Sequence, residues 1–373
     1  MDSEDASSPR GSEDVGGAAT RSPAAGSARV TLAQVAARAG VSPTAASFVL
    51  SGRTDQRIAE ETQQRVRTAA DELGYQPNLT ARILRTGTSG TIALVSDFIT
   101  STPYASAAVR GALEAARRHD TLLYIAETLG DPDLEERLLQ GLIGRRVDGF
   151  VYATMFTRTA TVPKAIRDLP LVLLNCTSPD VDAPEVVPDE RKAGATVARA
   201  LLDAGHRQGI FFVGSLPPGM SGGLQWSGLE AGALPERRRG VDAELRRAGV
   251  ELAGVLYPRD WDPEPSREAV TELLDRGQVP RALICANDRV AMGAYQALAR
   301  AGLRIPQDVS VISFDDSELA GWLEPGLTSI ALPHEELGRT AVELLLSSSR
   351  TNRRRIPMRL HERGSVAPPS MRH

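Results

Sequence analysis

Polar side chains follow several apolar runs that are predicted to be strands. They are a hydroxyl, two amides and four carboxylates: Ser96, Asp97, Asn175, Asn287, Asp288, Asp315 and Asp316. Because ligands of doubly wound sheets bind outside the carboxyl ends of the strands, we expect these groups to line a site for a small polar molecule. The pattern predicts binding chemistry, with hydrogen-bond donors and acceptors gathered at one edge of each sheet.

The sequence offers little support for catalysis or for a bound metal. No GxGxxG follows the first apolar run, and the pair Asp315 and Asp316 has no nearby His, Cys or nucleophilic Ser motif. Cys176 and Cys285 lie in apolar runs with no CxxC spacing, so we interpret them as core residues. We therefore expect no enzyme, no cofactor and no metal site.

From Thr91 onward, short apolar runs alternate with helical segments. Such alternation predicts α/β architecture with parallel sheets covered by helices on both faces. About four runs lie on each side of a midpoint near Val187, which favours two doubly wound lobes over residues 91–364 with a cleft between them. The runs are TIALVSDF, TLLYIAE, VDGFVYA, LPLVLLN, QGIFFVG, VELAGVLY, RALICAN and DVSVISF.

An all-α unit is predicted ahead of the lobes, over residues 29–76. Thr31 can cap a first helix that Gly40 ends, and Ser42 can cap a second. A third helix is expected over about residues 58–73, with Gly74 as its stop. Two helices joined by a tight turn are typical of a helix-turn-helix, although any small three-helix bundle would fit the same pattern.

Charge and composition separate the remaining segments. The chain carries a net charge of −4, yet residues 28–90 hold eight arginines against five carboxylates, a net of +3, which suits contact with phosphates but also an ordinary solvated surface. Residues 1–28 are rich in Ser, Gly, Ala and acids and predict a disordered tail; residues 77–90 are a hinge or linker, and 365–373 a second tail. No apolar run of about 18 residues and no secretory signal occur, so we expect a cytoplasmic protein without membrane contact.

Three separate segments resemble the lactose-repressor (LacI/GalR) family of bacterial transcription regulators. The motifs are VTLAQVAARAGVS, then GYQPNLTARILRTGTSGTIALV, then LICANDRVAMGAYQALARAGLRIPQDVSVISFDD with the later LTSI, and the match runs from Val30 to Gly364. The resemblance implies a homodimeric repressor with a helix-turn-helix headpiece, a hinge helix and a two-lobed core like that of periplasmic sugar-binding proteins. A palindromic operator and a small effector are the implied partners.

The resemblance also implies which headpiece and hinge residues meet DNA. Phe48 departs from the family, in which that position is usually Arg or His; its ring can pack on a thymine methyl but cannot donate to a guanine edge. Leu84 would be the apolar wedge between the central base pairs, unless residues 77–90 are a plain linker. The implied DNA-contacting residues are Thr31, Ser42, Pro43, Thr44, Ser47 and Phe48 in the headpiece, and Asn78, Ala81, Leu84 and Arg85 in the hinge.

The effector site is implied in the same way, anchored on Gly240. Arg237 falls on the family's effector-binding arginine, although Arg238 or Arg239 could take that place after the long loop before it. An arginine, amides, carboxylates and a flat aromatic face suit a sugar ring, so a carbohydrate is the expected effector. The implied effector-binding residues are Asp97, Asn175, Arg237, Trp261, Asn287 and Asp315.

Two other classes of protein would fit parts of this pattern. A nucleotide-dependent dehydrogenase would account for the alternating core alone. A soluble sugar-binding receptor would share the two lobes but would leave residues 30–86 without a role. The C-terminal VAPPSMRH has no leucine heptad, so a dimer is expected rather than a tetramer.

Overall fold

The computed structural model describes residues 30–50, 58–75, 87–99, 105–214, 232–347 and 353–370. The chain divides into two compact units, residues 1–85 and 86–373, and each is described by itself. The hinge predicted at residues 77–90 lies largely outside the described residues, as do the proposed tail at 1–28 and most of the loop before Arg237.

Within the described residues, the N-terminal unit contains three helices: α1 (Leu32–Ala39), α2 (Pro43–Leu50) and α3 (Glu60–Leu73). Thr31 and Gln34 form a reciprocal capping box at the start of α1, and Gly40 ends that helix with a φ of 66° that costs glycine nothing. Gly74 ends α3 in the same left-handed conformation. The predicted caps are confirmed. A single core joins the helices through Val35, Ala36, Ala39, Ala46, Val49, Val66, Ala69 and Ala70.

The first lobe is built on a six-stranded parallel sheet of order β11-β5-β4-β3-β1-β2. Helices α5 and α12 pack on one face, and α6 with the short 3-10 helix η1 packs on the other. The strands are β1 (Thr91–Ser96), β2 (Leu122–Glu127), β3 (Phe150–Thr159), β4 (Leu171–Thr177), β5 (Glu185–Pro188) and β11 (Arg353–Ile356), and the helices are α5 (Ala105–Arg118), α6 (Pro132–Gly144), η1 (Lys164–Ile166) and α12 (His334–Leu346).

The second lobe has a six-stranded sheet of order β12-β10-β9-β8-β6-β7, in which only the edge strand β12 runs antiparallel. Its strands are β6 (Ile210–Val213), β7 (Gly254–Leu256), β8 (Ala282–Cys285), β9 (Ser310–Asp315), β10 (Thr328–Ala331) and β12 (Arg359–His361). Its helices are α7 (Glu190–Asp203), α8 (Ala233–Arg247), α9 (Pro263–Asp275), α10 (Asp288–Arg300) and α11 (Glu318–Trp322).

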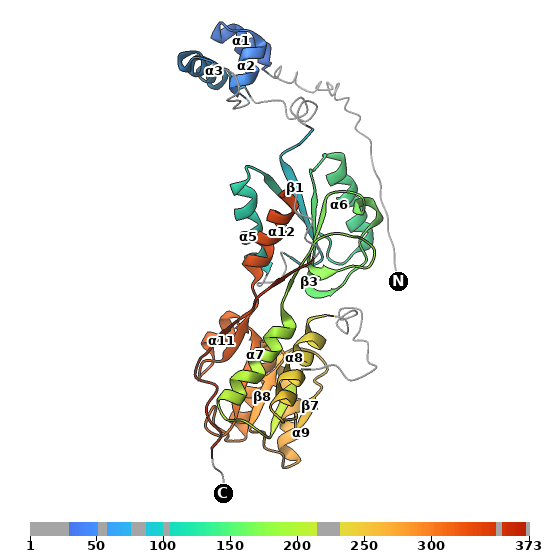
Figure 1. Cartoon of the computed structure of the whole chain (residues 1–373), viewed down its shortest axis with the longest axis vertical. Coiled ribbons are helices and arrows are strands. Elements are labelled where there is room, and N and C mark those ends of the chain that lie inside the picture. Colours follow the sequence, from blue (N-terminus) through green and yellow to red (C-terminus); the bar gives the residue numbers. More distant parts are fainter. Residues whose placement is uncertain are drawn as a thin grey trace, which may run out of the picture. The chain divides into compact units, whose positions relative to one another are not determined.

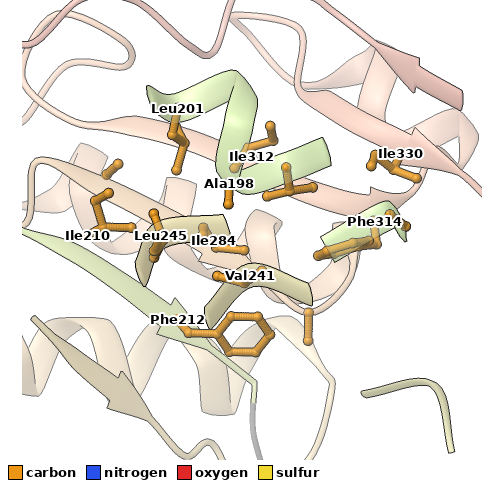
Figure 2. Packing of buried hydrophobic residues seen from close by; sticks show 14 of the residues in the cluster. Ala198, Leu201, Ile210, Phe212, Val241, Leu245, Ile284, Ile312, Phe314 and Ile330 are labelled. Carbon is orange, nitrogen blue, oxygen red and sulfur yellow. The ribbon is translucent and has the colours of Figure 1, made fainter. Parts of the chain in front are cut away.

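Both faces of the second sheet are covered. Figure 2 shows Leu201 of α7 and Val241 of α8 meeting Phe212, Ile284 and Ile312 of the sheet, in a core that is closed to water. Helices α9, α10 and α11 bury the opposite face. The predicted pair of parallel-sheet lobes with helices on both sides is confirmed.

The chain passes between the lobes three times, after β5, after β10 and between β11 and β12. The first lobe therefore takes α12 from near the C-terminus, and Figure 1 shows this red helix beside α5, with which it packs extensively. The expectation of about four strands per lobe was too low. The missed strands are β5, β10, β11 and β12, which have only three or four residues each.

Strand β2 is an edge strand of the first lobe and carries exposed apolar side chains. Leu122 is 67%, Tyr124 41% and Ile125 39% exposed, on a strand that pairs on one side only, with β1. An unpaired edge with apolar side chains is a surface on which proteins associate.

Candidate nucleic-acid interface and inter-lobe ligand site

Helix α2 has distinct inner and outer faces. Ala46 and Val49 are buried in the headpiece core, whereas Pro43 and Thr44 are exposed. Ser47 and Phe48, also predicted to meet DNA, are half-buried. A helix that projects a few small polar and apolar side chains from its N-terminal half can present them to base edges in a major groove.

Thr31 and Ser42 are exposed hydroxyls at the N-termini of α1 and α2. Thr31 Oγ1 accepts from the Gln34 amide at 3.4 Å, and Ser42 Oγ accepts from the Ala45 amide at 3.1 Å. Helix N-termini combine free N–H groups with a favourable dipole for phosphate. Both residues therefore lie where a DNA backbone contact would need them. The predicted hinge residues Asn78, Ala81, Leu84 and Arg85 lie outside the described residues.

In the second lobe, Arg237 on α8 is at the centre of a buried ion cluster. Its Nε donates to Glu190 Oε2 at 2.6 Å and its Nη2 to Oε1 at 3.1 Å, while Nη1 donates to the Ala286 carbonyl at 2.7 Å. The guanidinium also stacks on the Phe314 ring, 4.7 Å from its centroid. Both side chains of the Arg237–Glu190 pair are nearly inaccessible to water.

Asp315 completes this cluster at the end of β9. Its Oδ1 lies 3.5 Å from both Nη1 and Nη2 of Arg237, a long contact compared with those to Glu190. Burial raises the pKa of Asp315 to about 7, against the opposing effect of Arg237. Asp315 also has a φ of 98°, an unfavourable conformation for a residue with a side chain, and such strain is concentrated at functional sites.

The two polar residues after β8 hold the neighbouring backbone. Asn287 caps α10 by accepting from the Val290 amide at 2.8 Å. Asp288 accepts from three serines, and burial raises the pKa of its carboxyl while these hydrogen bonds lower it. The serines belong to β9, β10 and the turn before α11: Ser313, Ser329 and Ser317. Asp288 therefore joins three segments at the strand ends beside Asp315.

The predicted residues of the first lobe are engaged with their own backbone. Asp97 Oδ1 accepts from the Met155 amide at 2.8 Å, and Oδ2 forms an ion pair with Arg158 at 2.9 Å. Asn175 donates to the carbonyls of Thr154 and Met155 and accepts from Thr157. These bonds hold the irregular end of β3, where the register with β4 shifts. Asp97 and Asn175 shape the edge of the first lobe.

Trp261 lies between the lobes. Its ring meets that of Phe156, at the end of β3, edge to face with centroids 6.0 Å apart and planes at 84°. Trp261 also packs against the apolar cores of the second lobe. An aromatic residue of each lobe thus contributes to a contact between the lobes.

A cleft of about 1270 Å³ opens between the lobes. Ser106 and Ala107 of α5 line it from the first lobe, and Asp315 and Ser317 line it from the second, with His334 at the crossing that leads into α12. Burial, with a smaller contribution from Arg237, lowers the pKa of His334 to about 4, so its ring is neutral at physiological pH. Of the predicted effector residues, Asp315 alone lines this cleft; Arg237 and Asn287 are buried in the second lobe, and Trp261 is partly buried against Phe156.

Glu190, Phe156 and His334 belong to the site but were not predicted from the sequence. Glu190 opens α7 and is 3% exposed, and a buried glutamate has the same local signature as one that faces solvent at a helix start. Phe156 and His334 join the site only because the folded chain brings the two lobes together. Their roles depend on contacts far apart in sequence.

The chain combines a capped helix-turn-helix with two doubly wound lobes and an ion cluster at the strand ends. This combination defines a class of bacterial regulator with a periplasmic-binding-protein-like core. Residues 31–78 match the model of bacterial regulatory proteins of the lacI family. Residues 89–363 match that of periplasmic binding proteins and the sugar-binding domain of the LacI family. The chain belongs to the LacI family.

Individual relatives agree with this assignment. The chain is 30% identical to the ribose operon repressor of Haemophilus influenzae over 317 residues, which cover 85% of this chain and 91% of the relative. It is 32% identical to the sucrose operon repressor of Escherichia coli, over 83% and 92% of the two chains. A crystal structure of the Lac repressor dimer bound to operator has the same fold, with a TM-score of 0.73 at 23% identity, over 91% of this chain and 99% of that one.

None of the helices in the described ranges combines the length and the apolar character that a bilayer crossing requires.

Proposed function

We propose that this protein is a homodimeric transcriptional repressor whose affinity for a palindromic operator is controlled by a small sugar bound between its two lobes. The observation that carries this proposal is the presence, in one chain, of a capped helix-turn-helix and a two-lobed core with the Arg237–Asp315 cluster at its strand ends.

On the DNA side, α2 is the recognition helix. Pro43, Thr44 and Phe48 read base edges, whereas Thr31, Ser42 and Ser47 contact phosphates and fix the orientation. Leu84 of the hinge enters the minor groove between central base pairs and kinks the duplex at a deformable step. Two headpieces of a dimer then read two half-sites.

On the effector side, a sugar hydroxyl donates to Asp315, and Trp261 supplies an apolar plane. The ribose and sucrose operon repressors to which the chain is similar support a carbohydrate as the class of ligand. Ligand-dependent closure of the lobes alters the pairing of the two hinges, each of which ends directly before β1. A coupling of about 1 to 3 kcal/mol is typical of such linkage between two sites.

A sugar-binding receptor without DNA binding is the alternative. It would use the same lobes and cleft but gives the capped helices α1 and α2 no role. We therefore favour the regulator.

The decisive experiment is a titration of purified full-length protein against genomic DNA fragments that include its own promoter. We expect a site bound at least about 100-fold more tightly than random DNA, with log affinity falling linearly with log salt concentration as phosphate contacts are lost. A protein with no preference among these fragments is not a sequence-specific regulator.

The effector assignment is tested by repeating the operator titration with a panel of sugars. Asp315→Ala should abolish the response to the active sugar and leave ligand-free operator binding nearly intact. An Asp315→Ala protein that responds at the wild-type sugar concentration would show that the ligand binds elsewhere.

A further inference from the structure

The guanidinium of Arg237 has almost no capacity left for a ligand. Two of its N–H groups form a bidentate pair with Glu190, a third donates to the Ala286 carbonyl, and the remaining edge faces Asp315 at 3.5 Å. A free arginine in a binding site attracts carboxylate and phosphate groups through this same fork of donors. Here a residue of the chain occupies the position that an anionic ligand would take.

The backbones of α7 and α8 touch beside this ion pair. A Cβ on Gly194 of α7 would lie 1.9 Å from the Arg237 carbonyl oxygen, and one on Gly240 of α8 would lie 2.0 Å from the Arg191 carbonyl oxygen. The two helices therefore cross in backbone contact on both sides of the ion pair. Glu190 and Arg237 are held together by the main chain as well as by their charges.

The charge balance of the cluster is also unfavourable to an anion. Arg237 supplies one positive charge, Glu190 supplies one negative charge, and Asp315 adds a second when it is ionised. His334 adds none, because its ring is neutral at physiological pH. An anion that displaced Glu190 would leave a buried carboxylate without its partner, which is strongly unfavourable.

We propose that Glu190 is an internal counter-ion that closes Arg237 to anionic ligands, so that the part of the effector that reaches the Arg237–Asp315 cluster carries hydroxyl groups and not a phosphate or a carboxylate. This inference rests on the proposed function, since it concerns the same site. In this proposal Glu190 determines ligand specificity indirectly, by occupying Arg237, the residue that would otherwise bind an anionic ligand.

Within the ion cluster, Asp315 is the residue that can still bind an uncharged ligand. Its contacts with Arg237 are long, its side chain is 19% exposed, and it lies at the wall of the cleft. A carboxylate in this state accepts hydrogen bonds from hydroxyl groups, which bring no charge with them. Neutral sugars satisfy this requirement, whereas a phosphate or a carboxylate placed at this point would find no free donor on Arg237.

The test uses full-length protein without DNA and inorganic phosphate as the probe, compared with chloride at equal ionic strength. Phosphate should not protect α7 or α8 of the wild type from hydrogen exchange, because Arg237 is occupied. In Glu190→Gln the guanidinium loses its counter-ion, and phosphate should raise the Tm by about 2 to 5 °C. Hydrogen exchange should place the new protection at the start of α7 and the first two turns of α8.

Two matched variants serve as controls. Glu190→Asp keeps the negative charge and should gain no phosphate response. Glu244→Gln removes the charge of a different buried glutamate, on α8, which pairs with the exposed Arg199 and Arg247. Phosphate should give this variant no new protection around Arg237. A folded Glu190→Gln protein that phosphate neither stabilises nor protects would contradict the role of Glu190.

The wild type is informative even where Glu190→Gln fails to fold. Phosphate-dependent protection of α7 and α8 in the wild type would overturn the inference, because the site would then accept an anion with Glu190 in place. Its absence supports the inference. The operator titration tests whether the protein is a regulator, and the phosphate experiment, which uses no DNA, tests the role of Glu190. The two proposals can therefore fail independently.

Discussion

At the scale of single residues, Asp315 combines a strained backbone with a carboxyl group that loses its proton at an unusually high pH. Its φ is 98° and its pKa is raised by burial to about 7, against an ordinary value of 3.8. The folded state therefore holds this proton more tightly than the unfolded chain does. The stability that Asp315 contributes is fully present below about pH 4 and is lost as the pH rises through 7.

Asp315→Asn should remove this pH dependence, because an amide has no proton to lose. Relative to the wild type, the variant is expected to gain stability progressively between pH 4 and pH 8, by no more than about 4 kcal/mol. Glu190 still neutralises Arg237 in the variant. Urea unfolding at several pH values measures the difference, and a constant offset across this range would mean that Asp315 does not titrate there.

Phe48 provides a second test at this scale. Its ring can pack on a thymine methyl group but cannot donate a hydrogen bond to a base. Phe48→Ala should cost about 1 to 3 kcal/mol at one outer base pair of each half-site and should leave affinity for random DNA nearly unchanged. Competition against operators with single base changes measures this. Equal losses on all sequences would make Phe48 a core residue of the headpiece.

At the scale of elements, the contact of α7 with α8 positions the ion pair of the ligand site. Gly194→Ala places a methyl group 1.9 Å from a backbone carbonyl that cannot move aside without separating the helices. We expect a loss of about 2 to 4 kcal/mol in the free energy of unfolding, with sugar binding weakened.

Gly144→Ala is the matched control, since Gly144 is also in a helix but has no atom within 4 Å of its missing Cβ. It should change stability by less than about 1 kcal/mol, in the stabilising direction. Similar losses from both variants would show that helix propensity, and not the close crossing, explains the effect. Calorimetry of the two variants distinguishes these cases.

Elements whose ends depend on neighbouring residues were predictable from the sequence. Thr31 and Ser42 cap helices and Gly40 ends one, and each of them interacts only with residues less than about one helical turn away. These are the roles that their residue types favour. Strand β11 could not be predicted in this way, because Arg353 to Arg355 are exposed and form a strand only by pairing with β5. Glu190 was missed for a similar reason, since its burial is set by α8, more than forty residues later.

At the scale of the whole molecule, the exposed apolar side chains of β2 point to the surface through which two chains associate. Tyr124→Asp would place a charge at the centre of this edge strand, where desolvation on pairing is costly. We expect a shift from dimer to monomer in sedimentation, with a large loss of operator affinity because a single headpiece reads half of the site.

Val279→Asp is the control for this change. Val279 is 45% exposed in the connection between α9 and β8 of the other lobe. It should leave both the dimer and operator binding unchanged. A Tyr124→Asp protein that sediments as the wild type does would place the dimer contact elsewhere.

The threefold passage of the chain between lobes also sets the order in which the protein can fold during synthesis. The first lobe needs α12 and β11, and the second needs β12, so neither lobe can complete its sheet until the ribosome has made nearly the whole chain. The headpiece core, as far as the described residues show it, is made of residues 30–75. A nascent chain therefore carries a finished helix-turn-helix long before it has a lobe with which to dimerise. Truncation near the C-terminus would damage both lobes at once while sparing the headpiece.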